Sequence, residues 1–130
     1  MVIDGSIPHP DLGVITGEPI RMEVEDGLVC HITGGEQAEA LKRLLASYND
    51  GRVWEMGEIG IGLNEAGILS GRMLEDEGCH HTLHVAIGSG SSRAVFKRNN
   101  KCPFHLDMLM KNPTVEVDGR VIVKDGEPVC

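Results

Sequence analysis

Two Asp-Gly dipeptides, each set between extended runs of residues, restrict this chain to a fold that contains β-hairpins. The first, Asp26-Gly27, follows a run in which Ile20, Met22 and Val24 alternate with polar residues. The second, Asp118-Gly119, separates residues 114–117 from residues 120–123. Asp-Gly is a strong signal for a two-residue hairpin loop, because both positions must adopt positive φ. Residues 19–33 and 114–123 are therefore expected to form antiparallel hairpins.

A helix is expected over residues 34–49. Thr33 and Glu36 have the spacing of a capping box, and the pattern stops at Asn49-Asp50-Gly51. Between these limits, apolar residues recur at helical intervals, at Ala38, Leu41, Leu44, Leu45 and Tyr48. Several hairpins and one main helix (about 34–49) predict an α+β fold, with a mixed, mostly antiparallel sheet packed against that helix.

The intervening segments are expected to complete the sheet and its loops. Residues 52–59 are typical of a further strand, followed by a bend at Gly60-Ile61-Gly62, and residues 82–87 of another. Residues 73–78 carry three consecutive acidic residues and suggest an exposed turn. Residues 88–103, rich in Gly, Ser and charge, predict a loop.

Composition limits the functions that are open to the chain. Its 130 residues, 41% of them hydrophobic, suit a single domain (1–130). A net charge of −8 and only 3% aromatic residues argue against a nucleic-acid partner. No long apolar run or charged leader is present, so we expect a cytoplasmic protein without a membrane partner. The four cysteines lack a Cys-x-x-Cys pair and are expected to be reduced.

The residues with the clearest chemical potential are His84, His105 and Asp107. In a strand over residues 82–87, His84 faces away from the apolar side chains of its neighbours. His105 and Asp107 are two residues apart, so both project from one face of an extended backbone. Imidazoles and carboxylates together can hold a divalent metal, although either histidine could equally be an ordinary polar residue. Because neutral imidazole is the binding form, such a site should weaken below about pH 6.

His80 and His81 lie close to these residues in the sequence. Their role is open: they are exposed neighbours, or His80 shares a face with His84 if the strand begins early. Cys79 and Cys102 also lie near candidate ligands, and each is either a buried thiol or a further ligand.

Five ordered blocks resemble the aminopeptidase T type (thermophilic) metalloaminopeptidases over nearly the whole chain. They comprise residues 58–64, 74–77, 82–88, 105–107 and 113–119. The resemblance implies that Glu58, His84, His105 and Asp107 are metal ligands, with Glu58 also catalytic. It further implies a hydrolase, and a protease in particular, that binds Zn, Co or Mn and releases N-terminal amino acids from a peptide or small-molecule substrate.

The resemblance corresponds to the C-terminal metal-binding part of a longer architecture. The family's preceding domain and its Pro-x-Gly-Glu block have no counterpart in these residues, which leaves activity without them open. Apolar surface left by the missing domain suggests a homodimer or another homo-oligomer.

Two alternatives stay open. The blocks also resemble, more distantly, 2,5-dihydroxypyridine dioxygenase, in which His84, His105 and Asp107 would hold one Fe(II) for ring cleavage. The third possibility is a non-catalytic metal-binding or oligomerisation module.

Overall fold

The computed structural model describes residues 1–90 and 100–129, and all structural statements refer to this part of the chain. The first strands are β1 (Val2–Ile3), β2 (Ser6–Ile7), β3 (Gly13–Val14), β4 (Ile20–Glu25) and β5 (Leu28–Thr33). They are followed by helix α1 (Glu36–Ser47), the 3-10 helix η1 (Gly51–Trp54), strand β6 (Met56–Ile61), helix α2 (Met73–Asp76), and strands β7 (Thr82–Gly88) and β8 (His105–Lys111). The final strands are β9 (Val115–Val117), β10 (Arg120–Lys124) and β11 (Glu127–Pro128).

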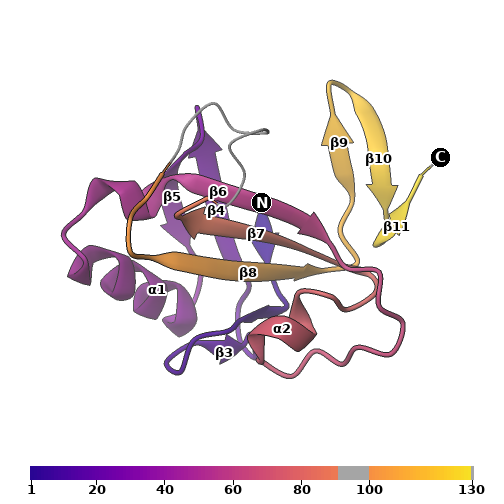
Figure 1. Ribbon diagram of the computed structural model, residues 1–130, viewed down its shortest axis with the longest axis horizontal. Helices are drawn as coiled ribbons and strands as arrows, with labels where there is room; N and C mark the ends of the chain where they lie inside the picture. Colours follow the sequence, from indigo (N-terminus) through magenta and orange to yellow (C-terminus); the bar gives the residue numbers. More distant parts are fainter. Residues whose placement is uncertain (91–99, 130) are drawn as a thin grey trace.

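The two larger sheets of the body are both antiparallel, with strand orders β1-β4-β5 and β6-β7-β8 (Figure 1). Helix α1 packs against β4 and β5. Buried side chains from both sheets and from α1 form one apolar cluster, which includes Met22, Ile32, Leu41, Val85 and Met108. The predicted α+β class is confirmed, because mostly antiparallel strands combine with one main helix.

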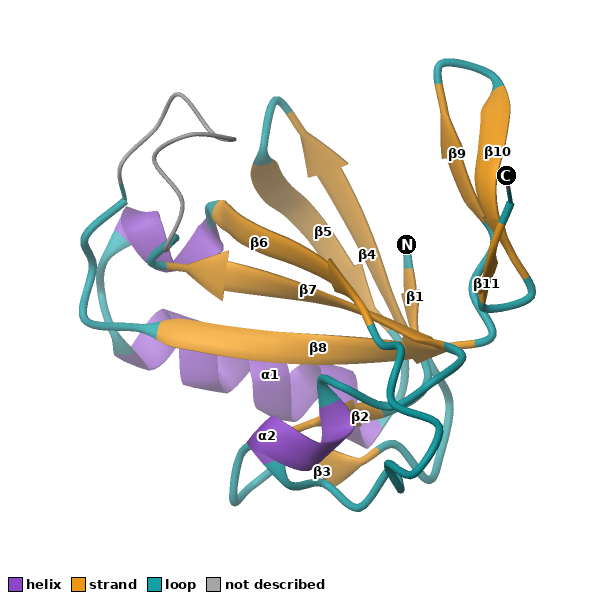
Figure 2. Ribbon diagram, turned by 45° about the vertical axis from the view of Figure 1, so that its right-hand side comes forward, coloured by secondary structure: helices purple, strands orange, loops and turns teal. Residues whose placement is uncertain are grey.

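Both predicted hairpins are confirmed. Strands β4 and β5 flank Asp26 and Gly27, at φ 49° and 79°, and β9 and β10 flank Asp118 and Gly119, at φ 50° and 77°. A third Asp-Gly pair at residues 125–126 has the same positive φ angles and adds β11. The resulting C-terminal hairpin arm, β9 to β11, projects from the body (Figure 2).

The predicted helix is confirmed, but its capping box is not. Helix α1 begins at Glu36, and its N-cap is Gly35, which provides no side-chain hydrogen bond. Thr33 is instead the last residue of β5, where it pairs with Arg21. Because Thr33 belongs to the strand and lies two residues before the N-cap, it does not cap the helix.

The expectations for residues 52–62 need correction. Residues 51–54 form the 3-10 helix η1, because the Asp50 carboxylate accepts a hydrogen bond from the Arg52 amide at 3.0 Å. The strand then runs through Gly60 and Ile61, where a bend was expected, because both residues pair with β7.

The expectation of an exposed acidic turn is wrong for Asp76, which is fully buried. Its carboxylate accepts hydrogen bonds from the Ser6 hydroxyl at 2.5 Å and from the Ser70 and Gly71 amides at 2.7 Å each. These bonds fasten the segment between β6 and β7 to β2 at the start of the chain.

Part of the predicted loop 88–103, including Arg93, Lys97 and Arg98, lies outside the described residues. Within the described part, no helix is long and apolar enough to cross a membrane.

Replacing Asp76 with alanine is expected to lower the free energy of unfolding by about 3 kcal/mol, because the buried Ser6 hydroxyl and two partly buried amides would lose their acceptor. Urea denaturation followed by circular dichroism would measure the change. Glu65→Ala, at an exposed position on the same segment, is the control and should have little effect. A loss as small as that of the control would contradict the anchoring role of Asp76.

Candidate metal centre

The pairing register of β6, β7 and β8 brings all four predicted ligands to one face of a sheet. Ala86 on the central strand lies opposite Glu58 on one side and Asp107 on the other. Directly opposed residues of antiparallel strands project to the same side, as do residues two apart on one strand. His84, two residues from Ala86, therefore projects to the same face as Glu58. His105, two residues from Asp107, projects to this face as well. The small side chain of Ala86 leaves space between the two carboxylates.

A β-bulge at Gly57 aims Glu58 toward this face. Met56 pairs with Ile87, whereas Glu58 pairs with Ala86, so one extra residue lies between them on β6. Met56 packs against the core and Glu58 faces the opposite side, although they are only two residues apart. A β-carbon at Gly57 would lie 2.9 Å from the carbonyl oxygen of Ser89, so the bulge favours glycine.

Three pairs among the four side chains lie within 4 Å. His84 Nε2 is 3.6 Å from Glu58 Oε1, and His105 Nε2 is 3.8 Å from Glu58 Oε2. His105 Nε2 is also 3.4 Å from Asp107 Oδ2. Donor atoms that share one ion at about 2.1 Å lie roughly 3.0–3.4 Å apart, so the distance between His105 and Asp107 matches that of a formed site, and the two distances from Glu58 are slightly longer.

His84 is buried without a hydrogen bond to its ring. It is only 7% exposed, and its two ring nitrogens are the buried side-chain polar atoms of the described residues that make no hydrogen bond. The imidazole lies over Gly60, where an added β-carbon would come within 2.2 Å of His84 Cε1. Buried polar atoms without a partner are costly, and a bound cation would satisfy one of them.

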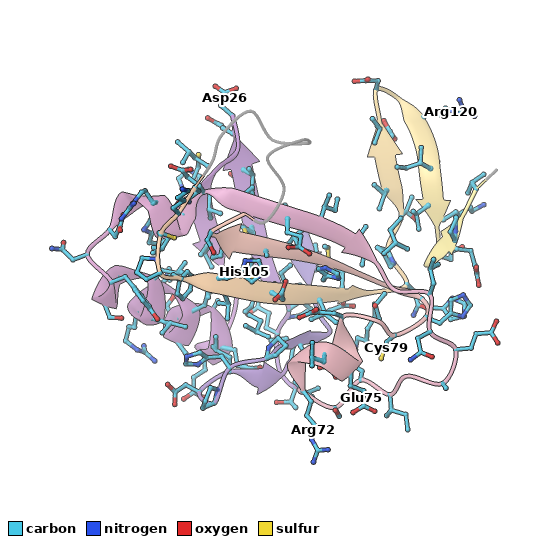
Figure 3. The ribbon with its side chains drawn as sticks, in the orientation of Figure 1. Asp26, Arg72, Glu75, Cys79, His105 and Arg120 are labelled. Atoms are coloured by element: carbon cyan, nitrogen blue, oxygen red, sulfur yellow. The ribbon has the colours of Figure 1, made fainter. Side chains whose placement is uncertain are left out.

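His105 lies at the start of β8 (Figure 3). Its Nδ1 donates a hydrogen bond to the Ser89 carbonyl at 2.6 Å, which turns Nε2 toward Asp107 and Glu58. The same arrangement orients many metal-binding histidines. The hydrogen bond to Asp107 raises the pKa of His105 to about 9 in the metal-free protein, although partial burial works against it.

Glu77 is a further member of the site, which the sequence did not single out. It hydrogen-bonds Asp107, and its pKa is raised by burial and by the negative charge of Asp107. Burial alone would raise the pKa of Asp107 as well, but the hydrogen bond from His105 and the positive charge beside it outweigh burial and lower it. Asp107 is therefore a buried carboxylate that both His105 and Glu77 contact.

Other candidates lie elsewhere. His80 and His81 precede β7 and contact Glu127 on the C-terminal hairpin arm, so neither shares the face of His84. Cys79 and Cys102 are buried free thiols whose sulfur atoms contact the carbonyl oxygens of Glu75 and Phe104. Both sulfur atoms thus face backbone carbonyls and not the candidate centre.

A cavity of about 570 Å³ lies on the opposite face of the sheet, lined in part by Ile59, Val85, Met110 and Val115. None of the four candidate ligands lines it. Because its lining is largely apolar and lies across the sheet from the imidazoles, we do not assign the cavity to the candidate centre.

Two imidazoles and a carboxylate on one face form the donor set of mononuclear non-haem iron oxygenases. This class of protein is therefore consistent with the site.

Comparison with known proteins places the chain in a family. The model of the 2,5-dihydroxypyridine 5,6-dioxygenase family matches residues 12–130, and the chain belongs to this family. A curated relative, the 2,5-dihydroxypyridine 5,6-dioxygenase of Pseudomonas putida KT2440, is 27% identical over 120 residues, which are 87% of this chain and 34% of the relative.

The solved structure of 2,5-dihydroxypyridine dioxygenase from the same organism has the same fold. It superposes with a TM-score of 0.82 at 24% identity, over 99% of this chain and 39% of that one. The chain thus spans little more than a third of either relative.

These comparisons correct the main functional expectation. The predicted aminopeptidase, and with it the hydrolase and protease classes, is wrong, because the family model and the curated relative both indicate a dioxygenase. The alternative resemblance to 2,5-dihydroxypyridine dioxygenase is the one supported. A dioxygenase family implies a metal cofactor, so the broader expectation of a divalent metal is retained.

Replacing Gly60 with alanine is expected to push the His84 imidazole out of its position and to lower the free energy of unfolding by about 1–3 kcal/mol. Urea denaturation and the NMR signals of the His84 ring would report both effects. Gly17→Ala is the control, because an added β-carbon there meets nothing within 4 Å. Unchanged His84 signals in the Gly60 variant would contradict the close approach.

Replacing Asp107 with asparagine is expected to lower the pKa of His105 from about 9 toward its ordinary value, because the hydrogen bond to the Asp107 carboxylate is the main cause of the raised pKa. NMR titration of the histidine ring protons in metal-free protein would follow the change. Glu116→Gln, which removes a carboxylate from the C-terminal hairpin arm, should leave the titration as it is. A His105 pKa still near 9 in the Asp107 variant would show that a group other than Asp107 raises it.

Proposed function

We propose that this chain is the metal-binding part of a dioxygenase that uses Fe(II) to open the ring of a hydroxylated pyridine. The observation that carries the proposal is the shared face of His84, His105 and Asp107, together with membership of the family. His84 and His105 would each give one imidazole nitrogen to the ion, and Asp107 one carboxylate oxygen. Bound Fe(II) supplies redox chemistry with dioxygen and leaves coordination positions for a chelating substrate.

The surrounding side chains support this assignment of roles. The Ser89 carbonyl fixes the ring of His105, and Glu77 contacts the carboxylate of Asp107. Both are interactions of the kind that orient first ligands. In this proposal Glu77 is a positioning residue.

Glu58 has a separate role in the proposal. Its two carboxylate oxygens face His84 and His105, and its side chain is 35% exposed, more than that of either His84 or Asp107. A carboxylate at the open side of the centre is suited to accept a proton from a substrate hydroxyl group. We therefore assign Glu58 to proton transfer instead of primary iron binding.

The raised pKa of His105 changes the expected pH dependence. In the metal-free protein His105 holds its proton up to a pH of about 9. Because binding requires the neutral ring, uptake of the ion releases this proton at neutral pH, and affinity rises with pH up to about 9. Metal affinity therefore begins to fall well above pH 6. For unperturbed histidines, the fall was expected only below about pH 6.

The proposed substrate class is the one named for the family and for the curated relative. Because the chain spans only part of their length, the whole reaction, a homo-oligomeric assembly and a cytoplasmic location remain proposals for this chain.

Anaerobic titration with Fe(II) tests the proposal. At this centre we expect one ferrous ion per chain, and loss of that ion in His84→Ala, His105→Ala and Asp107→Ala. Glu58→Gln should retain the ion and lose dioxygen consumption with 2,5-dihydroxypyridine. His31→Ala, which removes an exposed histidine on β5, is the matched control.

Binding of two ions per chain, both lost in Glu58→Gln, would reject the mononuclear centre. Iron binding without any turnover of 2,5-dihydroxypyridine would retain the centre and reject this substrate for the isolated chain.

A further inference from the structure

A second cluster of potential ligands lies outside the candidate centre, where the C-terminal hairpin arm meets the turn before β7. It consists of His80, His81 and Glu127. In the part of the chain that the structure describes, these form the one group of three whose potential ligand atoms all lie within 4.8 Å of one another. We propose that they bind a divalent cation of the zinc class, which fastens the arm to the body.

The geometry around Glu127 already resembles that of a metal site. Its Oε1 atom is 3.4 Å from His80 Nε2 and 3.4 Å from His81 Nδ1. Two ligands bound about 2.05 Å from a tetrahedral zinc ion lie about 3.3 Å apart. Two of the three separations therefore match those of a formed site.

The backbone explains how adjacent histidines can act together. In a regular strand, successive side chains point to opposite faces, so neighbouring imidazoles would not meet. His81 has φ of 61°, in the left-handed region, and this reverses the direction of the chain. The two rings consequently lie side by side, with centroids 4.0 Å apart. Non-glycine residues in this region are uncommon and often mark functional sites.

Hydrogen bonds hold the turn independently of any ion. The His80 amide donates to the Asn64 carbonyl at 3.0 Å, and the His81 carbonyl accepts from the Asn112 amide at 2.7 Å. The Thr82 hydroxyl donates to the Cys79 carbonyl at 2.7 Å. The two histidines are thus presented by a turn that is already formed, which reduces the cost of ordering them on binding.

The arm approaches this turn closely at Gly126. A β-carbon there would lie 2.7 Å from His81 Cα, so only glycine allows the contact. The Gly126 amide also donates to the Pro113 carbonyl at 2.9 Å. Glu127, the next residue, is therefore placed beside both imidazoles by the backbone itself.

The donor set defines the class of ion. Two neutral imidazoles and one carboxylate favour zinc and similar transition metals over magnesium or calcium, which prefer oxygen ligands. His81 and Glu127 are about half exposed, so water can complete the coordination. The ion would join the turn before β7 to the arm, which follows β8 in the chain (Figure 2).

Zinc titration by calorimetry tests the proposal without depending on iron or on turnover. His105→Ala serves as the background, because it removes a donor from the β-sheet centre. In this background we expect one equivalent of Zn²⁺ to bind, and affinity to fall roughly tenfold or more on adding Glu127→Gln or His80→Ala. Adding His31→Ala instead should leave binding intact. Circular dichroism would confirm that each variant is folded.

Hydrogen exchange supplies a structural readout. In the same background, Zn²⁺ should slow exchange of the amides of Gly126 and Val129, which bond to Pro113 and Ile122, and Glu127→Gln should abolish this protection. Failure of the background variant to bind zinc would overturn the proposal, as would binding that survives both ligand substitutions. Zinc binding without protection of the arm would reject its fastening role.

Discussion

The pairing of β7 with both neighbouring strands is the constraint on which the rest of the molecule depends. A shift of one residue in an antiparallel register moves every side chain to the other face. Here such a shift would bury His84 among Leu83's apolar partners and would separate Glu58 from Asp107. The same pairing gives β7 a core face and a polar face, so one strand serves both stability and chemistry.

The polar face of β7 includes buried groups that destabilise the metal-free protein, and the segment between β6 and β7 is attached beside it by hydrogen bonds. His84 keeps two buried nitrogens without hydrogen bonds, which costs free energy in the metal-free protein. Asp76, in contrast, is fully satisfied and fixes this segment to β2, and it is followed directly by Glu77, which contacts Asp107. Of these two adjacent acidic residues, Asp76 thus anchors the segment between β6 and β7, and Glu77 contacts a candidate ligand.

The sequence predicted the features that depend on short-range geometry. Asp-Gly turns and alternating residues gave both hairpins, and the spacing of His105 and Asp107 placed them on one face. Features that depend on pairing between distant segments were not predictable: the bulge at Gly57, the burial of Asp76 and the left-handed conformation of His81. Thr33 misled because the capping-box pattern does not reveal whether a residue already belongs to a strand. The aminopeptidase resemblance implied four ligands and the dioxygenase resemblance only His84, His105 and Asp107, so the ligand roles stay a prediction, although the chemistry first assigned to the chain was wrong.

Ala86 has a consequence that extends to related chains. It is fully buried between Glu58 and Asp107, and its methyl group leaves room for the candidate centre. A homologue with valine or leucine at this position could keep the strand, the core and every ligand residue, and still have a filled centre. The size of this one side chain would therefore distinguish homologues able to hold an ion from descendants that have kept only the scaffold.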